Sequence, residues 1–221
     1  MRADGRPKQA KGIVKREVIK VVTPGTNLNS QALDETKNNY LMSIVYLGDV
    51  LGVAIADYST GDFFVTEIET GAELIDEINK FVPSEIILNE YFAMSGIDLT
   101  FISEKLSISV STLENWYFDD DSCKAKLKEH FHVNMLDGLG IKDYPVGIDA
   151  AGALLIYLTQ TQKSDMSHIT SIVPYTTGKY MLIDSSSDEI LSLLRLCVKS
   201  RKKGSLLWYL IRPRLQWAQE R

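Results

Sequence analysis

The chain has 221 residues, of which 45% are hydrophobic, and a formal net charge of −5. This length and composition are sufficient for one or two domains with buried cores. The chain has no run of about 18 apolar residues and no apolar stretch at its N-terminus, so we expect no membrane span and a cytoplasmic location. Its two cysteines, Cys123 and Cys197, are too few and too far apart for a disulfide framework or a cysteine metal cluster.

The charge is distributed unevenly along the chain. Residues 1–20 contain seven Lys or Arg against two Asp or Glu, and residues 195–221 contain eight against one. The two ends thus carry +5 and +7, which leaves about −17 on residues 21–194, given the net charge of −5. An acidic region of this size repels phosphate backbones, so only the two ends are candidates for contact with nucleic acid. The alternative for both ends is a solvated basic tail.

The first elements predicted along the chain are strands. Residues 15–26, KREVIKVVTPGT, begin with a basic strand-like alternation that stops at a Pro-Gly turn. An isolated strand cannot bury its apolar face, so this one needs a sheet supplied from elsewhere. Three strands are expected next, over 40–47, 50–59 and 62–69. The dipeptides Gly48-Asp49 and Thr60-Gly61 between them are typical of two-residue hairpin turns, which predicts an antiparallel meander.

The hydrophobic period then alternates between helical segments and buried strands. A helix that ends at Pro83 is predicted from the spacing of Ala72, Ile75, Ile78, Asn79 and Val82. The following segments predict a strand parallel to its neighbour over 84–89, a loop and short helix over 93–106, a strand over 107–113, and helices over 119–131 and 147–162. This order predicts an α/β domain with an open mixed sheet, antiparallel on one side, as in ribonuclease H-like folds.

The character of the sequence changes again after Lys163. Short strands and turns are followed by an apolar stretch with a basic insert. We therefore place a domain boundary near Ser164 and expect a partial, mainly helical segment over 165–221.

Three carboxylates of the α/β region are candidates for catalysis. They are Asp57 on the second strand of the meander, Glu67 on the third, and Asp149 at the start of a helix. A ribonuclease H-type nuclease needs three or four carboxylates that converge on two metal ions. Asp57 lies on the second strand rather than the first, where such enzymes place their leading Asp, and solvated strand ends explain all three residues equally. We expect no catalytic, cofactor or metal site in this chain, and a nuclease built on these three residues is the alternative.

Several stretches of the chain are specific enough to indicate a family. They are AKGIVKREVIKVVTPGT (10–26), VLGVAIADYSTGDFFVTEI (50–68), AAGALLIYL (150–158), HITSI (168–172), YMLIDSSS (180–187) and KKGSLLWYL (202–210). In these stretches the sequence resembles the bacterial MutS family of DNA mismatch-recognition ATPases. The resemblance covers nearly the whole chain, and it corresponds to roughly a quarter of a full-length MutS.

The resemblance implies a domain organisation. Residues 1–26 would be a remnant of the mismatch-binding domain, so that the basic strand is its last strand and the rest of its sheet would lie upstream. Residues 27–164 would form the connector domain, and residues 165–221 would begin the core, or lever, domain. In this family the connector links mismatch recognition to the ATPase and offers a docking surface for a MutL-type protein.

The resemblance also implies what other parts of such a protein supply. The full-length family forms dimers, binds mismatched DNA, and uses ATP and Mg. The Phe-x-Glu mismatch wedge and the Walker A phosphate loop of the family are not found in this sequence. We therefore expect no ATPase activity and no mismatch recognition from this chain itself.

Three segments depart from the family pattern, and a shift of reading frame accounts for each. Residues 188–198 and 211–221 can be encoded by nucleotide strings that, read with one added base, give family-like sequence. MRADGRP at the N-terminus behaves in the same way. We interpret these stretches as frameshifted, so a functionless gene remnant is a further alternative. Resequencing of the locus tests this, because unrelated codons in those windows would remove the interpretation.

Overall fold

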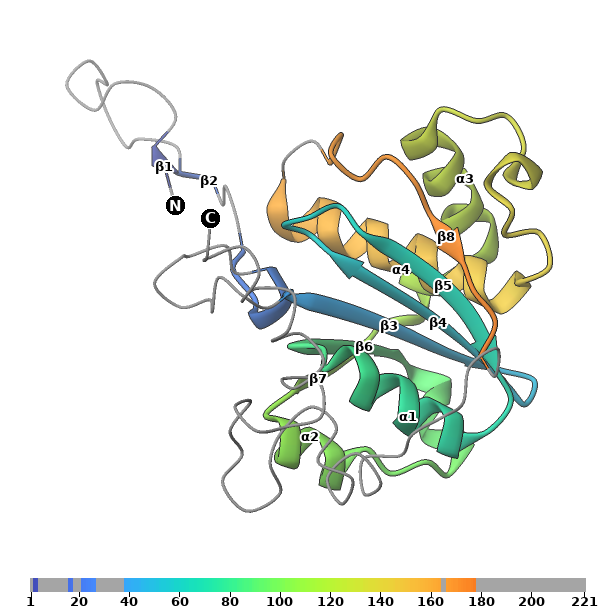
Figure 1. Ribbon diagram of the computed structural model, residues 1–221. Coiled ribbons are helices and arrows are strands. Elements are labelled where there is room, and N and C mark those ends of the chain that lie inside the picture. The colour runs from blue at the N-terminus through green and yellow to red at the C-terminus, as the bar shows by residue number, and fades with distance from the viewer. Residues whose placement is uncertain (1, 4–15, 18–20, 27–37, 164–165, 178–221) are drawn as a thin grey trace, which may run out of the picture. The chain divides into compact units, whose positions relative to one another are not determined.

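The computed structural model of the chain describes residues 2–3, 16–17, 21–26, 38–163 and 166–177. Two compact units are present, Met1–Thr177 and Gly178–Arg221, and the second lies outside the described residues. Within the first unit, six strands form one sheet in the order β7-β6-β3-β4-β5-β8 (Figure 1). These strands are β3 (Tyr40–Leu47), β4 (Val50–Asp57), β5 (Phe63–Ile68), β6 (Glu85–Asn89), β7 (Ser109–Leu113) and β8 (Val173–Pro174).

The remaining elements are helices and one short pair of strands. The α-helices are α1 (Gly71–Phe81), α2 (Thr100–Leu106), α3 (Asp120–Phe131) and α4 (Pro145–Gln162). The 3-10 helices are η1 (Pro24–Thr26), η2 (Glu90–Ser95), η3 (Asn115–Phe118) and η4 (Leu136–Leu139). Strands β1 (Arg2–Ala3) and β2 (Arg16–Glu17) pair with each other in antiparallel fashion. No helix in the described part of the chain is long and apolar enough to cross a membrane.

The sheet is mixed, as the sequence predicts. Strands β3, β4 and β5 form an antiparallel meander, whereas β6 runs parallel to β3 and β7 runs parallel to β6. The predicted strands and helices from residue 40 to residue 162 are all present, with ends that differ by a few residues. The predicted α/β class, with an antiparallel meander on one side of a mixed sheet, is confirmed.

The two turns of the meander differ from each other. Gly48 and Asp49 form the predicted two-residue turn, and both have positive φ angles, of 57° and 71°. This is the backbone of a type I′ turn, which matches the twist of the flanking strands. The prediction of a second two-residue turn at Thr60-Gly61 is wrong, because β4 ends at Asp57 and β5 begins only at Phe63.

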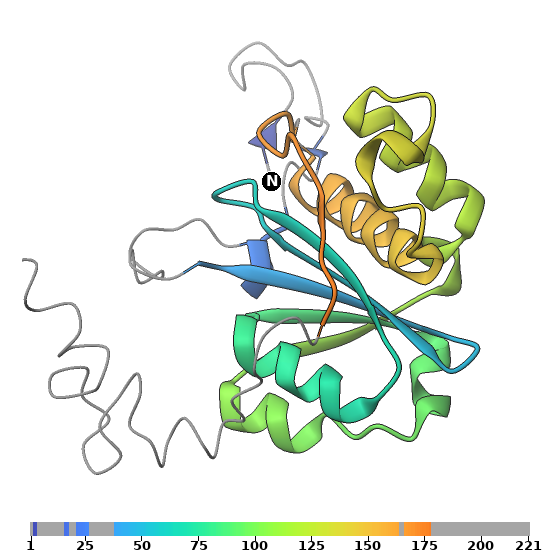
Figure 2. The ribbon, with the colours of Figure 1, turned by 45° about the vertical axis from the view of Figure 1, so that its right-hand side comes forward.

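The sheet is covered by helices on both faces (Figure 2). Successive residues of a strand point to opposite faces, so Leu41 and Val45 of β3 enter one core and Met42 and Ile44 enter the other. We call the first the α4-side core, because α4 supplies much of it, and the second the α1-side core. Strands buried on both faces are apolar at nearly every position, which explains the continuous apolar runs of β3 and β4.

The predicted face of helix α1 is wrong by about one residue. Its buried positions are Leu74, Glu77 and Ile78, whereas Ile75 and Val82 are more than a third exposed. Helical spacing alone indicated the stripe with Ile75 and Val82, because the charged Glu77 interrupts the apolar pattern of the stripe that is buried. Val82 has the left-handed conformation that ends the helix, directly before Pro83.

Helix α4 packs unusually close to its neighbours because glycine occupies the contact points. A Cβ at Gly52 of β4 would lie 2.2 Å from the carbonyl oxygen of Val146 at the start of α4. A Cβ at Gly152 would lie 2.3 Å from Cβ of Cys123 in α3. The sheet, α4 and α3 are therefore layered at distances that leave no room for a methyl group at these two positions.

The segments that flank the connector sequence also belong to the first compact unit. Residues 166–177, here called the trailing segment, place β8 beside β5 in the sheet and bury Met166, Ile169 and Ile172 in the α4-side core. The domain boundary near Ser164 stays a prediction. The first compact unit extends beyond it, to Thr177. Of the predicted basic strand, only Arg16–Glu17 is a strand among the described residues, and Pro24–Thr26 forms a 3-10 turn.

The close packing of α3 on α4 predicts the effect of one methyl group. We expect Gly152→Ala to lower the free energy of unfolding by about 1–3 kcal/mol, because the added Cβ has to displace the backbone of Cys123. Urea unfolding of the full chain measures this change. Gly138→Ala is the matched control, since a Cβ there meets nothing within 4 Å, and equal stabilities of the two variants would contradict the prediction.

Candidate functional site

Asp57, the first of the three candidate carboxylates, organises the β4–β5 turn. It is fully buried at the end of β4. Its Oδ1 accepts hydrogen bonds from the amide and hydroxyl of Ser59, at 2.7 and 2.6 Å, and its Oδ2 accepts one from the amide of Asn39 at 3.1 Å. Carboxylates commonly stabilise turns by accepting bonds from the backbone two residues ahead. Both carboxylate oxygens of Asp57 are therefore engaged in hydrogen bonds with this chain.

Glu67, the second candidate, joins β5 to helix α4. Its Oε1 accepts a hydrogen bond from the amide of Gly147 at 2.8 Å, in the first turn of α4. The first amides of a helix have no partner within the helix, and a negative charge near them is favourable. Tyr144, the residue before α4, makes no capping bond with its side chain, and Glu67 caps the helix in its place.

Asp149, the third candidate, lies on the side of α4 that faces α3. Its side chain is 6% exposed, and its Oδ1 has no hydrogen-bond partner. Burial, and then the neighbouring Asp120 carboxylate, raise the pKa of Asp149 from 3.8 to about 7. Lys124 opposes this shift and is held by Asp120 at 2.6 Å. Asp149 is thus a buried acid that is substantially protonated near neutral pH.

The three carboxylates do not converge. Glu67 pairs with Gly52 across the sheet, and Asp57 lies five residues further along β4, or about 17 Å away at the usual rise of a strand. Asp149 follows the Glu67 contact at Gly147 by two residues, or about 200° around the helix. Among the residues that the structure describes, no group of three or more His, Cys, Asp or Glu side chains could hold a metal ion. A two-metal nuclease centre finds no support in this arrangement.

Cys123 is also a packing residue. It is fully buried against Gly152, and its thiol donates to the carbonyl oxygens of Tyr117 and Asp149 at 3.3 and 3.4 Å. Burial, and then the surrounding acidic side chains, raise the pKa of Cys123 to about 12. The thiolate is the reactive form of cysteine, so this thiol is inert at neutral pH.

Two buried Glu–Tyr pairs are the polar features that the sequence analysis missed. Glu85 accepts a hydrogen bond from the Tyr157 hydroxyl at 2.6 Å, and Glu77 accepts one from the Tyr175 hydroxyl at 2.6 Å. Burial, and then the paired carboxylate, raise the pKa of each tyrosine. A sequence signal existed for Glu77, because it falls at helical spacing between Leu74 and Phe81.

Each pair holds a segment that enters or leaves the domain. The Glu85–Tyr157 pair contacts residues 21–26, here called the leading segment, through a 3.0 Å bond from the Gly25 amide to Glu85. The Glu77–Tyr175 pair holds the trailing segment against α1. Lys80 strengthens this second contact, with its Nζ 3.0 Å from Glu77 and 4.5 Å from the centre of the Tyr175 ring.

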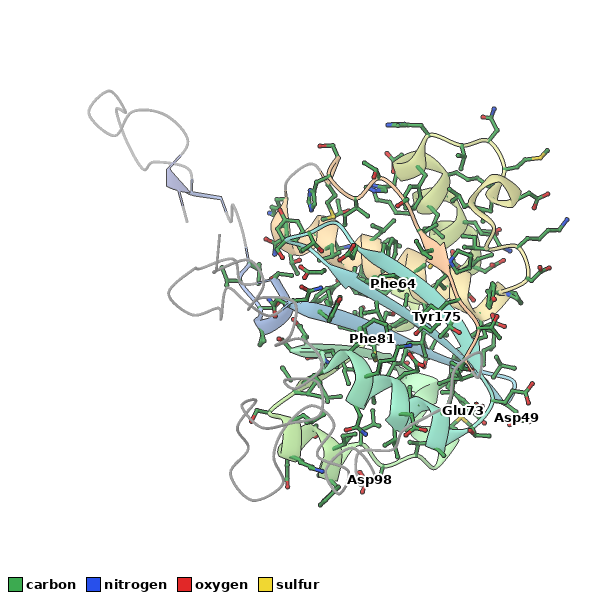
Figure 3. All side chains as sticks on the ribbon, viewed as in Figure 1. Asp49, Phe64, Glu73, Phe81, Asp98 and Tyr175 are labelled. Atoms are coloured by element: carbon green, nitrogen blue, oxygen red, sulfur yellow. The ribbon has the colours of Figure 1, made fainter. Side chains whose placement is uncertain are left out.

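Aromatic side chains complete the trailing contact. Phe64, Phe81 and Tyr175 gather on this side of the sheet (Figure 3), and the ring of Tyr175 lies 6.4 Å from that of Phe64 and 6.2 Å from that of Phe81. Such spacings are typical of favourable aromatic pairs. Taken together, the described fold and its polar contacts define the class of protein, an α/β domain with a mixed sheet whose carboxylates hold neighbouring chain segments in place.

Comparison with known proteins identifies the family. The family model described as MutS domain II matches residues 39–170. The chain is 53% identical over 204 residues to the DNA mismatch repair protein MutS of Lachnoclostridium phytofermentans, an alignment that covers 92% of this chain and 22% of the relative. The MutS of Ruminiclostridium cellulolyticum is 43% identical over 207 residues, covering 92% of this chain and 23% of the relative.

The chain therefore belongs to the MutS domain II family, and the described domain is the ribonuclease H-like connector of that family. The predicted resemblance is confirmed, including its extent along the chain. The chain spans less than a quarter of the length of these two curated relatives.

The raised pKa of Asp149 predicts a pH dependence of stability. Because the folded state holds this proton up to about pH 7 and the unfolded state loses it near 3.8, the folded state binds more protons in that window, and stability falls as pH rises through it. The side chain of Asn resembles the neutral acid. We therefore expect the free energy of unfolding of Asp149→Asn at pH 8 to be higher than that of the wild type by at least about 1 kcal/mol.

Urea unfolding of the full chain at pH 4.5 and pH 8 checks this expectation. The exposed neighbour Asp121 gives the matched control Asp121→Asn, which should keep the pH dependence of the wild type. The interpretation of Asp149 is wrong if its variant loses stability between the two pH values as much as the wild type does.

Proposed function

We propose that this chain acts as the connector of a MutS-type mismatch repair protein. In this role the domain transmits between mismatch recognition and the ATPase, and it offers a docking surface to a MutL-type protein. The observation that carries the proposal is the match of MutS domain II over residues 39–170, a range that contains strands β3 to β7 of the described sheet and its four α-helices. The role is one of interaction rather than of chemistry.

The arrangement of the carboxylates supports a role without catalysis. Asp57 and Glu67 are each bonded to backbone amides, and Asp149 is buried beside Asp120. ATP and Mg belong, in this proposal, to other parts of a full-length protein, as do dimer formation and contact with mismatched DNA. The proposed location is cytoplasmic, where such repair takes place.

The proposed docking of a MutL-type protein predicts direct binding by the folded domain. We expect a purified MutL-type protein to bind the immobilised 221-residue chain saturably. Gly138→Ala should bind as the wild type does. Gly52→Val should lose binding, because its side chain collides with the backbone of Val146 where α4 meets the sheet.

Surface plasmon resonance with the three chains provides the measurement, and circular dichroism reports whether each is folded. Absence of binding by the folded wild-type chain would refute MutL docking. Undiminished binding by an unfolded Gly52→Val chain would assign the contact to a part of the sequence other than the described domain.

The charge of the domain predicts weak and unselective contact with DNA. Residues 21–194 carry about −17, whereas the basic ends carry only +5 and +7. We expect a dissociation constant no tighter than generic non-specific association, on the order of 10⁻⁴ M at physiological salt. We expect no preference for a mismatch, because discrimination needs a side chain that inserts at the mispair.

A titration against two duplexes that differ by a single G·T mismatch tests both expectations. The duplexes should be compared at two salt concentrations, since non-specific contact weakens steeply with salt. Sub-micromolar affinity, or a several-fold preference for the mismatched duplex, would contradict the proposal. It would show that this chain itself recognises mismatched DNA, a function that we assign to other parts of a full-length protein.

A further inference from the structure

The leading segment is bound in a polar socket on the connector. We define the socket as Glu85 of β6, Asn39 before β3, and Tyr157, Thr161 and Gln162 of α4. Two backbone contacts fix the start of the segment, since the Val21 amide donates to the Thr161 carbonyl at 2.7 Å and the Gln162 side chain donates to the Val21 carbonyl at 3.3 Å. Elements far apart in sequence thus meet at residues 21–26.

Glu85 is the centre of this socket. Its side chain is 2% exposed, with Oε1 accepting from the Tyr157 hydroxyl at 2.6 Å and Oε2 accepting from the Gly25 amide at 3.0 Å. A buried carboxylate is strongly destabilising unless donors satisfy it. Oε2 obtains its donor from the leading segment. When that segment is absent from the socket, Oε2 of Glu85 therefore lacks this hydrogen bond.

The Pro-Gly turn has the shape that this socket requires. A Cβ at Gly25 would lie 3.0 Å from Oε2 of Glu85 and 3.0 Å from a methyl group of Leu41, which is closer than side chains normally approach. The carbonyl of Pro24 accepts a 3.1 Å bond from the Asn39 side chain. The hydroxyls of Thr23 and Thr26 bond to each other at 2.8 Å and close the turn. The sequence Thr-Pro-Gly-Thr therefore fits the socket residue by residue.

The socket restrains a segment that covalent linkage alone would restrain weakly. Residues 27–37 join the leading segment to the rest of the domain, and an extended chain of this length reaches up to about 36 Å. Pro24 and Asn39 are nevertheless in direct hydrogen-bonded contact. The position of residues 21–26 is thus set by the socket contacts.

We propose that the socket is an intramolecular docking site that binds the leading segment as a separable unit, with Glu85 as its positioning residue. The inference rests on the proposed connector function, in which motion of a preceding domain has to reach the sheet. When the segment is docked, residues 21–26 are bonded to β6 and α4. When it is released, these bonds are lost and the sheet remains folded.

Amide hydrogen exchange of the full chain, followed by mass spectrometry of its peptides, tests the proposal. Glu85→Gln keeps the side-chain shape but leaves only one acceptor oxygen for Gly25 and Tyr157. We expect exchange in a peptide that covers 21–26 to accelerate about tenfold or more, the factor expected from the loss of a hydrogen bond to a charged group. Exchange in β3 and β4 should stay unchanged, because local opening does not unfold the sheet.

Glu77→Gln is the matched control, because it alters the other buried Glu–Tyr pair. It should accelerate exchange at the trailing segment, where the Tyr175 amide bonds to the Val65 carbonyl at 3.0 Å, and leave residues 21–26 unchanged. The proposal is overturned if Glu85→Gln leaves exchange at 21–26 as in the wild type. It is equally overturned if that variant accelerates exchange by the same factor throughout the domain.

A second variant keeps the test decisive if Glu85→Gln prevents folding. Tyr157→Phe removes a single hydroxyl while the ring remains, and that hydroxyl interacts both with Glu85 and with the side chain of Thr23 in the leading segment. Accelerated exchange confined to 21–26 supports the socket, and unchanged or uniformly faster exchange rejects it. The MutL-binding assay is independent of this readout, so failure of the proposed docking function and failure of the socket are distinguishable.

Discussion

Helix α4 lies between the sheet and α3, and the rest of the domain depends on how closely it packs there. Its amide at Gly147 is capped by Glu67, its start presses on Gly52, and its middle presses on Cys123 through Gly152. An apolar helix buried on nearly all sides gains most when no gap is left between the layers. The same helix presents Tyr157, Thr161 and Gln162 to the leading segment, so a shift of α4 would move the socket as well.

Four acidic side chains of the domain, three of them buried and Glu67 half-buried, act as anchors for chain segments. Asp57 holds a turn, Glu67 holds a helix start, and Glu85 and Glu77 hold the leading and trailing segments. Carboxylates engaged in this way have few lone pairs left for a metal or a substrate. Asp149 differs, since it is buried beside another acid, Asp120, whose charge and hydrogen bond favour the protonated form of Asp149 and raise its pKa.

Local patterns predicted the order and type of the elements well, because strand alternation, helical spacing and the Gly48-Asp49 turn are properties of neighbouring residues. The errors arose where distant residues decide the outcome. The spacing that indicated α1 does not mark its buried face, which includes Glu77, bonded to Tyr175 almost a hundred residues later. The β4–β5 turn is longer than expected because Asp57 bonds to Ser59 and Asn39, and β4 ends at Asp57 rather than at residue 59.

The candidate carboxylates illustrate the same division. The sequence places Asp57, Glu67 and Asp149 on the correct elements, but only the strand register shows that they lie apart. The polar pairs of the two flanking segments were not predictable from spacing, since each joins residues about seventy or more positions apart. The leading and trailing segments are both held through a buried glutamate that accepts a hydrogen bond from a tyrosine on another element. The two contacts differ in kind, because the Glu85 contact with residues 21–26 is polar and small, whereas the trailing segment also buries Met166, Ile169 and Ile172 in the α4-side core. A local opening that leaves both apolar cores intact is therefore open to the leading segment and not to the trailing one.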